Sequence, residues 1–138
     1  MIVIDASVIV KWIKNDEADS QIARLIYFQH KEGKEKIIVP QLLFYEVANY
    51  LATKTRFSPN EIKQGIKMIF QTELQLCSEE KTDLVESAVF ANKYNTSVYD
   101  MLYAVIAKKQ KTILITADER FIQKTKFPFV KLLSEYKI

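Results

Sequence analysis

Four acidic side chains stand where the surrounding sequence would favour apolar or small residues: Asp5, Glu46, Asp100 and Asp118. Asp5 directly follows the apolar run 2–4, and Asp118 comes shortly after the apolar run 112–115. Burying an ionised carboxylate in such surroundings is costly unless it is paired, hydrogen-bonded or bound to a metal. These four acids are therefore the residues that could do chemistry.

Three of the acids also have an ordinary structural interpretation. Asp5 and Asp118 could each cap the helix that follows, and Thr116 could share that role with Asp118. Ser97 and Asp100 have the spacing of a capping box. The residues after Asp100, however, are apolar nearly all round the predicted helix, so that helix should be buried and its first-turn acid should point into the protein.

Glu46 is the hardest of the four to explain as structure. It lies in the middle of a predicted helix, between aromatic and aliphatic neighbours. The alternatives are a salt bridge to Arg56 or to a lysine, or a glutamate that faces solvent.

The elements that must position these acids alternate between short strands and longer helices. Buried strands are predicted at 2–4 and 37–39, and further short strands at 74–76, 112–115 and 129–132. Helices are predicted at 7–13, 17–31, 40–55, 58–71, 81–94, 97–109 and 119–124. This alternation favours an α/β fold of three layers, α/β/α, with a mostly parallel central sheet of about five short strands. We expect a single domain over 1–138.

Several local signals fix these expectations. Pro40 should lie in the first turn of its helix, and Ser58-Pro59-Asn60-Glu61 is a strong helix start. The helix at 81–94 should be amphipathic through its apolar residues, which are Leu84, Val85, Ala88, Val89 and Ala91.

The sheet gives the acids a reason to meet. In an open parallel sheet the functional crevice lies at the carboxyl ends of the strands. Asp5 and Asp118 lie just past strand ends, and Glu46 and Asp100 lie in early helical turns at the same edge. Like charges a few ångströms apart repel by about 4 kcal/mol per pair at an effective dielectric of about 20, so a cation should accompany them. An all-oxygen site favours Mg²⁺ or Mn²⁺ over zinc or copper.

Composition excludes several other chemistries. The 138 residues carry a net charge of +3, which permits an anionic partner without demanding one. The one histidine, His30, lies in a polar helix end and is expected to be a solvated surface residue, and the one cysteine, Cys77, is expected in the core. Catalysis by a Ser-His-Asp or Cys-His arrangement is therefore not expected, because the single histidine has no candidate nucleophile or acid patterned beside it. The N-terminus has neither a basic region nor an uninterrupted apolar run, so a cytoplasmic location is expected.

Four segments together resemble a known family. They are V-I-D-A-S at the N-terminus, P-Q-L-L-F-Y-E-V-A-N in mid-chain, Y-D-M-L-Y-A-V-I-A, and the late T-A-D-E-R-F. In this order and spacing the chain resembles PIN domains, and especially the VapC-like ribonuclease toxins of toxin–antitoxin pairs. The resemblance covers essentially the whole chain.

The resemblance implies roles for particular residues. The acidic site that binds magnesium or manganese and does catalysis would be Asp5, Glu46, Asp100 and Asp118. Ser7 and Thr116 match small hydroxyl positions that support such a site. Asn49 and Arg120 are candidate substrate contacts, although a polar group on a helix face and an exposed charge are the simpler interpretations. The position of the last acid varies among such proteins, and here the resemblance assigns it to Asp118.

The resemblance also implies an activity and partners. The reaction would be endonucleolytic cleavage of single-stranded or looped RNA that leaves a 3′-hydroxyl, with metal chemistry in place of a side-chain nucleophile. The chain would form a homodimer, and a small antitoxin would plug the acidic cleft with its C-terminal segment.

Other functions remain open at this stage. Haloacid-dehalogenase-type phosphatases need Asp-x-Asp after the first strand, and here Ser7 stands at the second acid position. Receiver domains need an adjacent acidic pair, which Asp5 lacks. A PIN nuclease with a housekeeping role in RNA processing, or a catalytically inactive PIN scaffold that binds RNA or protein, would show the same sequence features.

Overall fold

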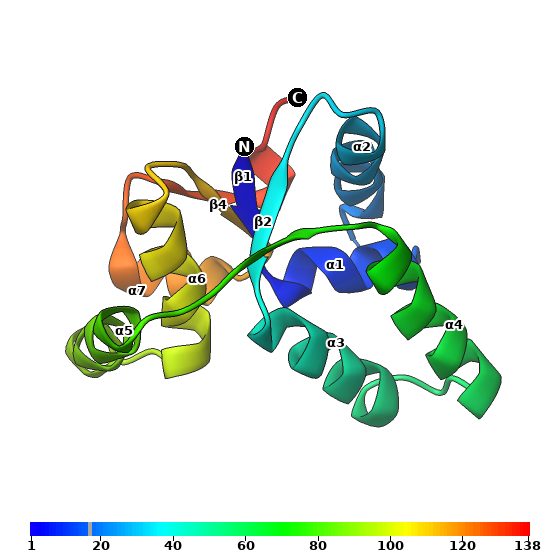
Figure 1. The fold of residues 1–138 in the computed structure, drawn as a ribbon, viewed down its shortest axis with the longest axis horizontal. Helices are drawn as coiled ribbons and strands as arrows, with labels where there is room; N and C mark the ends of the chain where they lie inside the picture. Colours follow the sequence, from blue (N-terminus) through cyan, green and yellow to red (C-terminus); the bar gives the residue numbers. More distant parts are fainter. Residues whose placement is uncertain (17) are drawn as a thin grey trace.

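The computed structural model describes residues 1–16 and 18–138 and shows a parallel β-sheet between two layers of helices (Figure 1). The sheet has five strands in the order β3-β2-β1-β4-β5. Their bounds are β1 (Ile2–Ile4), β2 (Ile37–Pro40), β3 (Gln75–Cys77), β4 (Leu114–Thr116) and β5 (Val130–Leu132). The expected α/β class and parallel five-stranded sheet are confirmed.

Helices from the first half of the chain lie on one side of the sheet, and α5 and α6 lie on the other (Figure 1). The first group is α1 (Ala6–Ile13), α2 (Ser20–Lys31), α3 (Leu42–Thr53) and α4 (Pro59–Gln71). The second part contains α5 (Lys81–Tyr94), α6 (Val98–Lys109), α7 (Glu119–Thr125), which packs on β5, and the short 3₁₀ helix η1 (Leu133–Glu135). Within the described residues, no helix is long and apolar enough to cross a membrane.

The centre of the sheet explains the continuous apolar runs. β1 pairs with β2 on one side and with β4 on the other, with Val3 opposite Ile38 and Leu114. All three residues of β1 are buried, as expected for a strand covered on both faces. The helix α6 packs on β1, β2 and β4, and residues 101–107 are all buried along it. Its apolar circumference therefore reflects contact with the sheet on one side and with α5 on the other.

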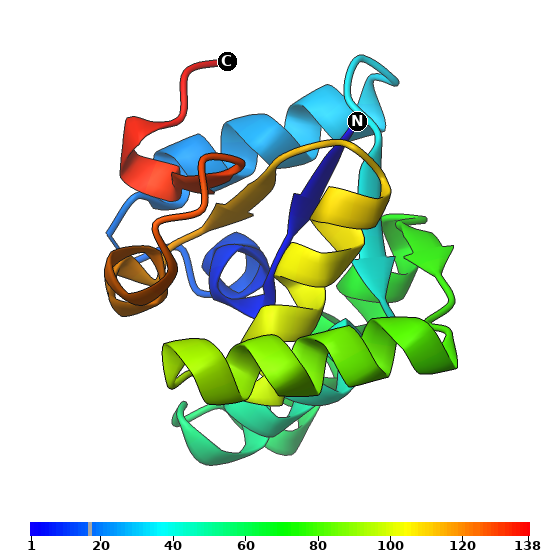
Figure 2. The same cartoon turned by 90° about the vertical axis from the view of Figure 1, so that its left-hand side faces the viewer.

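The carboxyl edge of the sheet is where the chain turns into the helices that carry the acids. β1 leads into α1 and β2 leads into α3, whereas α6 runs in the opposite direction and begins at this same end of the molecule (Figures 1 and 2). The parallel sheet thus brings three segments that are distant in sequence to one edge: the β1–α1 junction, the β2–α3 junction and the start of α6.

Two helix starts differ from the expectation. Pro40 is the last residue of β2, opposite Cys77 of β3, and α3 begins only at Leu42. A proline can end a strand as readily as it can open a helix, since in both places its missing N–H matters little. The helix expected at 17–31 begins at Ser20, after Asp19 with a positive φ of 62°; residue 17 lies outside the described residues. The capping box of Ser58 and Glu61 is present as expected.

The orientation of α5 is the larger correction. Its apolar residues Leu84, Val85 and Val89 are 56%, 53% and 60% exposed. The face packed on α6 instead carries Asp83 and Ser87 with Ala91, all of them buried. Asp83 can be buried because it accepts a hydrogen bond from Lys109 Nζ of α6 at 2.9 Å. Leu84, Val85 and Val89 of α5 therefore face outward.

His30 and Cys77 also differ from expectation. His30 is half-buried, and its Nδ1 accepts from the Ile37 amide at 3.3 Å while Nε2 lies 3.0 Å from the Thr72 carbonyl oxygen. This ring ties α2 to β2 and to the end of α4, so the expectation of a solvated surface histidine was wrong. Cys77 is half-buried at the edge of the core, where Gln110 Nε2 donates to its Sγ at 3.6 Å.

Candidate active site

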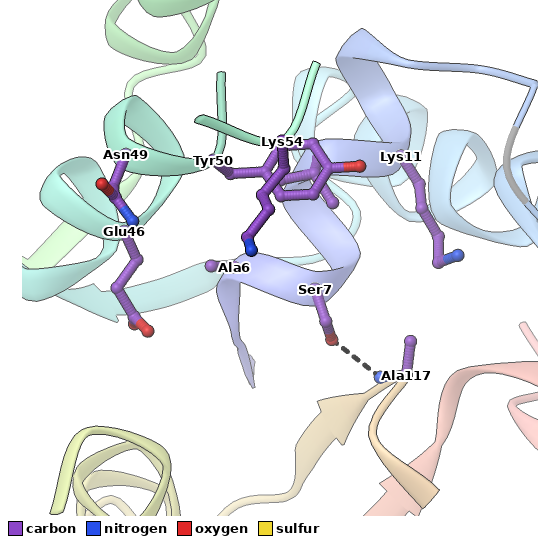
Figure 3. A pocket seen from close by; sticks show the side chains of 9 residues that line it. Ala6, Ser7, Lys11, Glu46, Asn49, Tyr50, Lys54 and Ala117 are labelled. Atoms are coloured by element: carbon purple, nitrogen blue, oxygen red, sulfur yellow. Dashed lines mark hydrogen bonds between the residues drawn. The ribbon is translucent and has the colours of Figure 1, made fainter. Parts of the chain in front are cut away.

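Asp5 is held between the two central strand ends by hydroxyl groups. It caps α1, and its Oδ1 accepts from the Ser7 amide at 3.0 Å and from the Ser7 hydroxyl. Its Oδ2 accepts from Thr116 Oγ1, at the end of β4, at 2.5 Å. Ser7 Oγ in turn accepts from the Ala117 amide at 2.9 Å (Figure 3). The expected supporting residues Ser7 and Thr116 thus fix both oxygens of the carboxylate.

The environment of Asp5 disfavours its charge. Burial raises the pKa of Asp5 from 3.8 to about 6, against the lowering effect of the hydrogen bonds from Ser7 and Thr116. The negative charges of Asp100 and Glu46 raise this pKa further. Asp5 is therefore a hydrogen-bonded carboxylate whose ionisation costs the fold energy.

Glu46 of α3 reaches across to Tyr103 of α6. The Tyr103 hydroxyl donates to Glu46 Oε1 at 2.6 Å. Burial raises the pKa of Glu46, the hydrogen bond from Tyr103 lowers it, and the charge of Asp100 raises it. Among the described residues no ion pair joins Glu46 to Arg56 or to a lysine, so the salt-bridge alternative is not what the structure shows.

Asp100 lies in the first turn of α6, where Ser97 caps the helix by accepting from the Asp100 amide at 3.0 Å. Burial raises the pKa of the Asp100 carboxyl group. Hydrogen bonding to Ser97 and the charge of Lys124 lower this pKa, whereas the charge of Asp118 raises it. The cap itself uses the Asp100 backbone N–H, so it does not depend on the charge of the carboxyl group.

Asp118 stands to one side of the other acids. It caps α7 by accepting from the Phe121 amide at 3.1 Å, and its own amide donates to Thr116 Oγ1 at 3.0 Å. Its charge raises the pKa of Asp100. The pKa values of Asp5 and Glu46 are raised by the charge of Asp100 instead, and that of Asp5 also by the charge of Glu46. The capping interpretation of Asp118 is confirmed.

The structure therefore places Asp5, Glu46 and Asp100 near enough for the charge of Asp100 to act on the other two, and places Asp118 beside Asp100. Glu46 and Ser7 line a cavity of about 430 Å³, and Asp100 and Asp118 line a separate cavity of about 210 Å³. Across residues 1–16 and 18–138, no three acidic, histidine or cysteine side chains are gathered closely enough to hold a metal ion as they stand. The donor set nevertheless suits a hard divalent cation, since it consists of carboxylates that repel one another.

The comparison with protein families decides the classification. The family model described as PIN domain matches residues 2–127, nearly the whole chain. The chain belongs to the PIN domain family.

Solved structures share the fold of this PIN domain at low identity. VapC20 of Mycobacterium tuberculosis, described as a sarcin-ricin loop cleaving toxin, is 11% identical with a TM-score of 0.70, over 91% of this chain and 95% of that one. A toxin–antitoxin complex from Klebsiella pneumoniae is 15% identical with a TM-score of 0.66, over 100% of both chains. VapBC2 of Rickettsia felis, bound to a DNA fragment from its promoter, is 16% identical with a TM-score of 0.63, over 96% and 97%. No curated protein matches the chain in sequence.

PIN domains are typically nucleases and generally use divalent metals. In this PIN domain the structure adds residues that the sequence reasoning missed. Tyr103 follows Asp100 by one helical turn, a spacing that could have indicated a shared face. Lys54, directly after the end of α3, lines the larger cavity, and Lys124 lines the smaller one. The candidate contacts Asn49 and Arg120 line the larger and the smaller cavity respectively.

Proposed function

We propose that this PIN domain is a metal-dependent endoribonuclease, with Asp5, Glu46 and Asp100 as its principal carboxylates and Asp118 as an accessory acid. The observation that carries the proposal is that Asp5, Glu46 and Asp100 are half-buried near one edge of the sheet, where burial raises the pKa of each and the charge of a neighbouring acid raises it further. Asp5 and Glu46 are satisfied only by neutral hydroxyl and amide donors among the described residues. A cluster of this kind costs stability and is therefore more consistent with function than with structure.

The residues of the chain would do distinct parts of the work. Ser7 and Thr116 hold Asp5 in one orientation, and Tyr103 holds Glu46 toward α6. Mg²⁺ or Mn²⁺ bound by these acids would supply Lewis-acid activation of water and stabilisation of the charge on the phosphate and leaving oxygen. The side chains themselves need only bind, orient and hold charge.

The test is a cleavage assay on single-stranded and looped RNA. Mg²⁺ or Mn²⁺ should be required, EDTA should abolish cleavage, and added Mn²⁺ should restore it. Full activity in EDTA would overturn the metal assignment. RNA binding without cleavage at any metal concentration would favour an inactive PIN scaffold.

We also propose that the chain is the toxin of a toxin–antitoxin pair. Its structural neighbours include toxin–antitoxin complexes from two bacteria. Co-purification from cells that carry the native operon should recover a small protein encoded beside this chain. Absence of any adjacent small reading frame would favour a housekeeping nuclease in RNA processing.

The outward apolar face of α5 supports the proposed homodimer. Leu84, Val85 and Val89 form an exposed stripe on one helix, and two-fold dimers bury the same patch on both copies. Leu84→Lys with Val89→Lys should convert a dimer to a monomer in light scattering, whereas Leu25→Lys, an exposed residue of α2, should not. A wild-type monomer at all concentrations would contradict this proposal.

A further inference from the structure

Cationic side chains line each of the two cavities that the candidate acids border. In the larger cavity, Glu46, Asn49 and Tyr50 lie along one face of α3, opposite Ser7 of α1, and Lys54 follows them directly after the end of the helix (Figure 3). The spacing of three and four residues places Asn49 and Tyr50 on the same face as Glu46. Moving along α3 from the acids, the wall therefore changes from a carboxylate to an amide and an aromatic ring, and then to an exposed ammonium group.

The smaller cavity also combines acids with cations. Asp100 and Asp118 line it together with Arg120 and Lys124 of α7. Lys124 Nζ donates to the Asn95 carbonyl oxygen at 2.7 Å, which fixes this ammonium group beside the cavity. Arg120 is exposed.

We propose that one RNA strand crosses the carboxylates from the larger cavity to the smaller one, with Lys54 binding a phosphate on one side and Arg120 binding a phosphate on the other. This path rests on the proposed nuclease function. A polyanion repelled by three carboxylates needs cations that flank them, and phosphate contacts of this type set the position of a strand without reading its sequence. Tyr50 gives the larger cavity an aromatic wall on which a base can stack.

The arrangement favours a nucleic acid over a basic peptide. A peptide whose cationic side chain paired with the acids would meet Lys54 and Arg120 at the two exits, where like charges repel. An RNA strand has the opposite charge at these exits. The volume of the larger cavity, about 430 Å³, is within the range of small-molecule sites, roughly 300–1,000 Å³, so it can hold a nucleotide.

Three charge-neutralising variants test the path: Lys54→Gln, Arg120→Gln and, as the control, Lys63→Gln. Lys63 is an exposed residue of α4 outside both cavities, so all three variants lose the same net charge. Binding of a short fluorescein-labelled single-stranded RNA is measured by anisotropy in EDTA, as a function of salt concentration. Circular dichroism confirms that each variant is folded.

The expected result follows from counterion release. Loss of one phosphate contact on single-stranded RNA should reduce the slope of log affinity against log salt by about 0.7, which corresponds to about five-fold weaker binding at about 0.1 M salt. Lys54→Gln and Arg120→Gln should each show both effects, and Lys63→Gln should show neither. In the cleavage assay the same two variants should raise KM more than they lower kcat.

The failures are distinguishable. If the wild-type protein cleaves RNA but Lys54→Gln and Arg120→Gln bind it as Lys63→Gln does, the path is wrong and the nuclease function stands. If these two variants keep RNA affinity but lose a protein partner encoded beside the chain, the cavities bind that partner and the path is also wrong. If the wild-type protein neither binds nor cleaves RNA, the proposed function itself fails.

Discussion

The pH dependence of stability without metal is a direct consequence of the Asp5 environment. The pKa of Asp5 is about 6 in the folded protein against 3.8 for an ordinary aspartate, so the folded state binds this proton more tightly than the unfolded state does. The contribution of Asp5 to the free energy of unfolding should therefore be largest below about pH 4 and should be lost as pH rises through about 6. A shift of about two pKa units corresponds to about 3 kcal/mol, and the partial exposure of the residue reduces this toward about 2 kcal/mol.

Urea denaturation in EDTA at several pH values between 4 and 7 measures this loss. The raised pKa values of Glu46 and Asp100 act in the same direction. Asp5→Asn should flatten the curve over this window, whatever its effect on the absolute stability, and Mn²⁺ should recover stability at neutral pH in the wild-type protein. A wild-type curve that is level or rises from pH 4 to 6 would refute the argument that Asp5 is ionised at a cost.

Tyr103→Phe tests a contact of the candidate site, and Asp83→Asn tests the packing of α5 on α6. Tyr103→Phe removes the donor to Glu46 and should lower the free energy of unfolding by about 1.5–3 kcal/mol, the range for a hydrogen bond to a charged group. It should leave more cleavage activity than Glu46→Gln does. An unchanged denaturation midpoint would show that the hydroxyl contributes nothing to stability. Asp83→Asn should lower the melting temperature more than Glu86→Gln, because Asp83 is buried against Lys109 whereas the Glu86–Lys108 pair is exposed. Equal effects of these two substitutions on the melting temperature would contradict this expectation. Burial by itself raises the pKa of Asp83, but hydrogen bonds from Lys109 and from the Glu80 amide lower it below its ordinary value. The stability that Asp83 contributes should therefore be lost as pH falls below about 4.

The sheet and the approximate positions of the acids could be predicted from the sequence because both depend on short-range patterns. Continuous apolar runs such as Ile2–Ile4 occur where a strand is covered on both faces, and this is what the structure shows. A helix cap and a functional acid are not exclusive alternatives here, since Asp5 and Asp118 cap helices and also lie at the carboxyl edge of the sheet. Capping fixes the position of a carboxylate without removing its charge.

The remaining features depended on tertiary contacts that no local pattern records. The apolar residues of α5 indicated a buried face, but Asp83 found a partner in Lys109, twenty-six positions later in the sequence, and the helix packs by its small and polar residues instead. The sequence pattern indicated that Tyr103 is one of the apolar core residues of α6. Only the three-dimensional structure shows that its hydroxyl donates to Glu46 of α3. The division of the acids between two cavities was equally invisible in the sequence.

The central claim is that Glu46 and Asp100 act in catalysis and not in stability, and one measurement on Glu46→Gln and Asp100→Asn tests it. The rate of RNA cleavage in Mn²⁺ should fall by orders of magnitude in both variants, while the melting temperature without metal should hold or rise because one repelling charge is removed. Neither variant should lose the cap from Ser97, worth about 0.5–2 kcal/mol, since that bond uses the Asp100 backbone. A Glu46→Gln protein that is destabilised but still cleaves RNA would contradict the account.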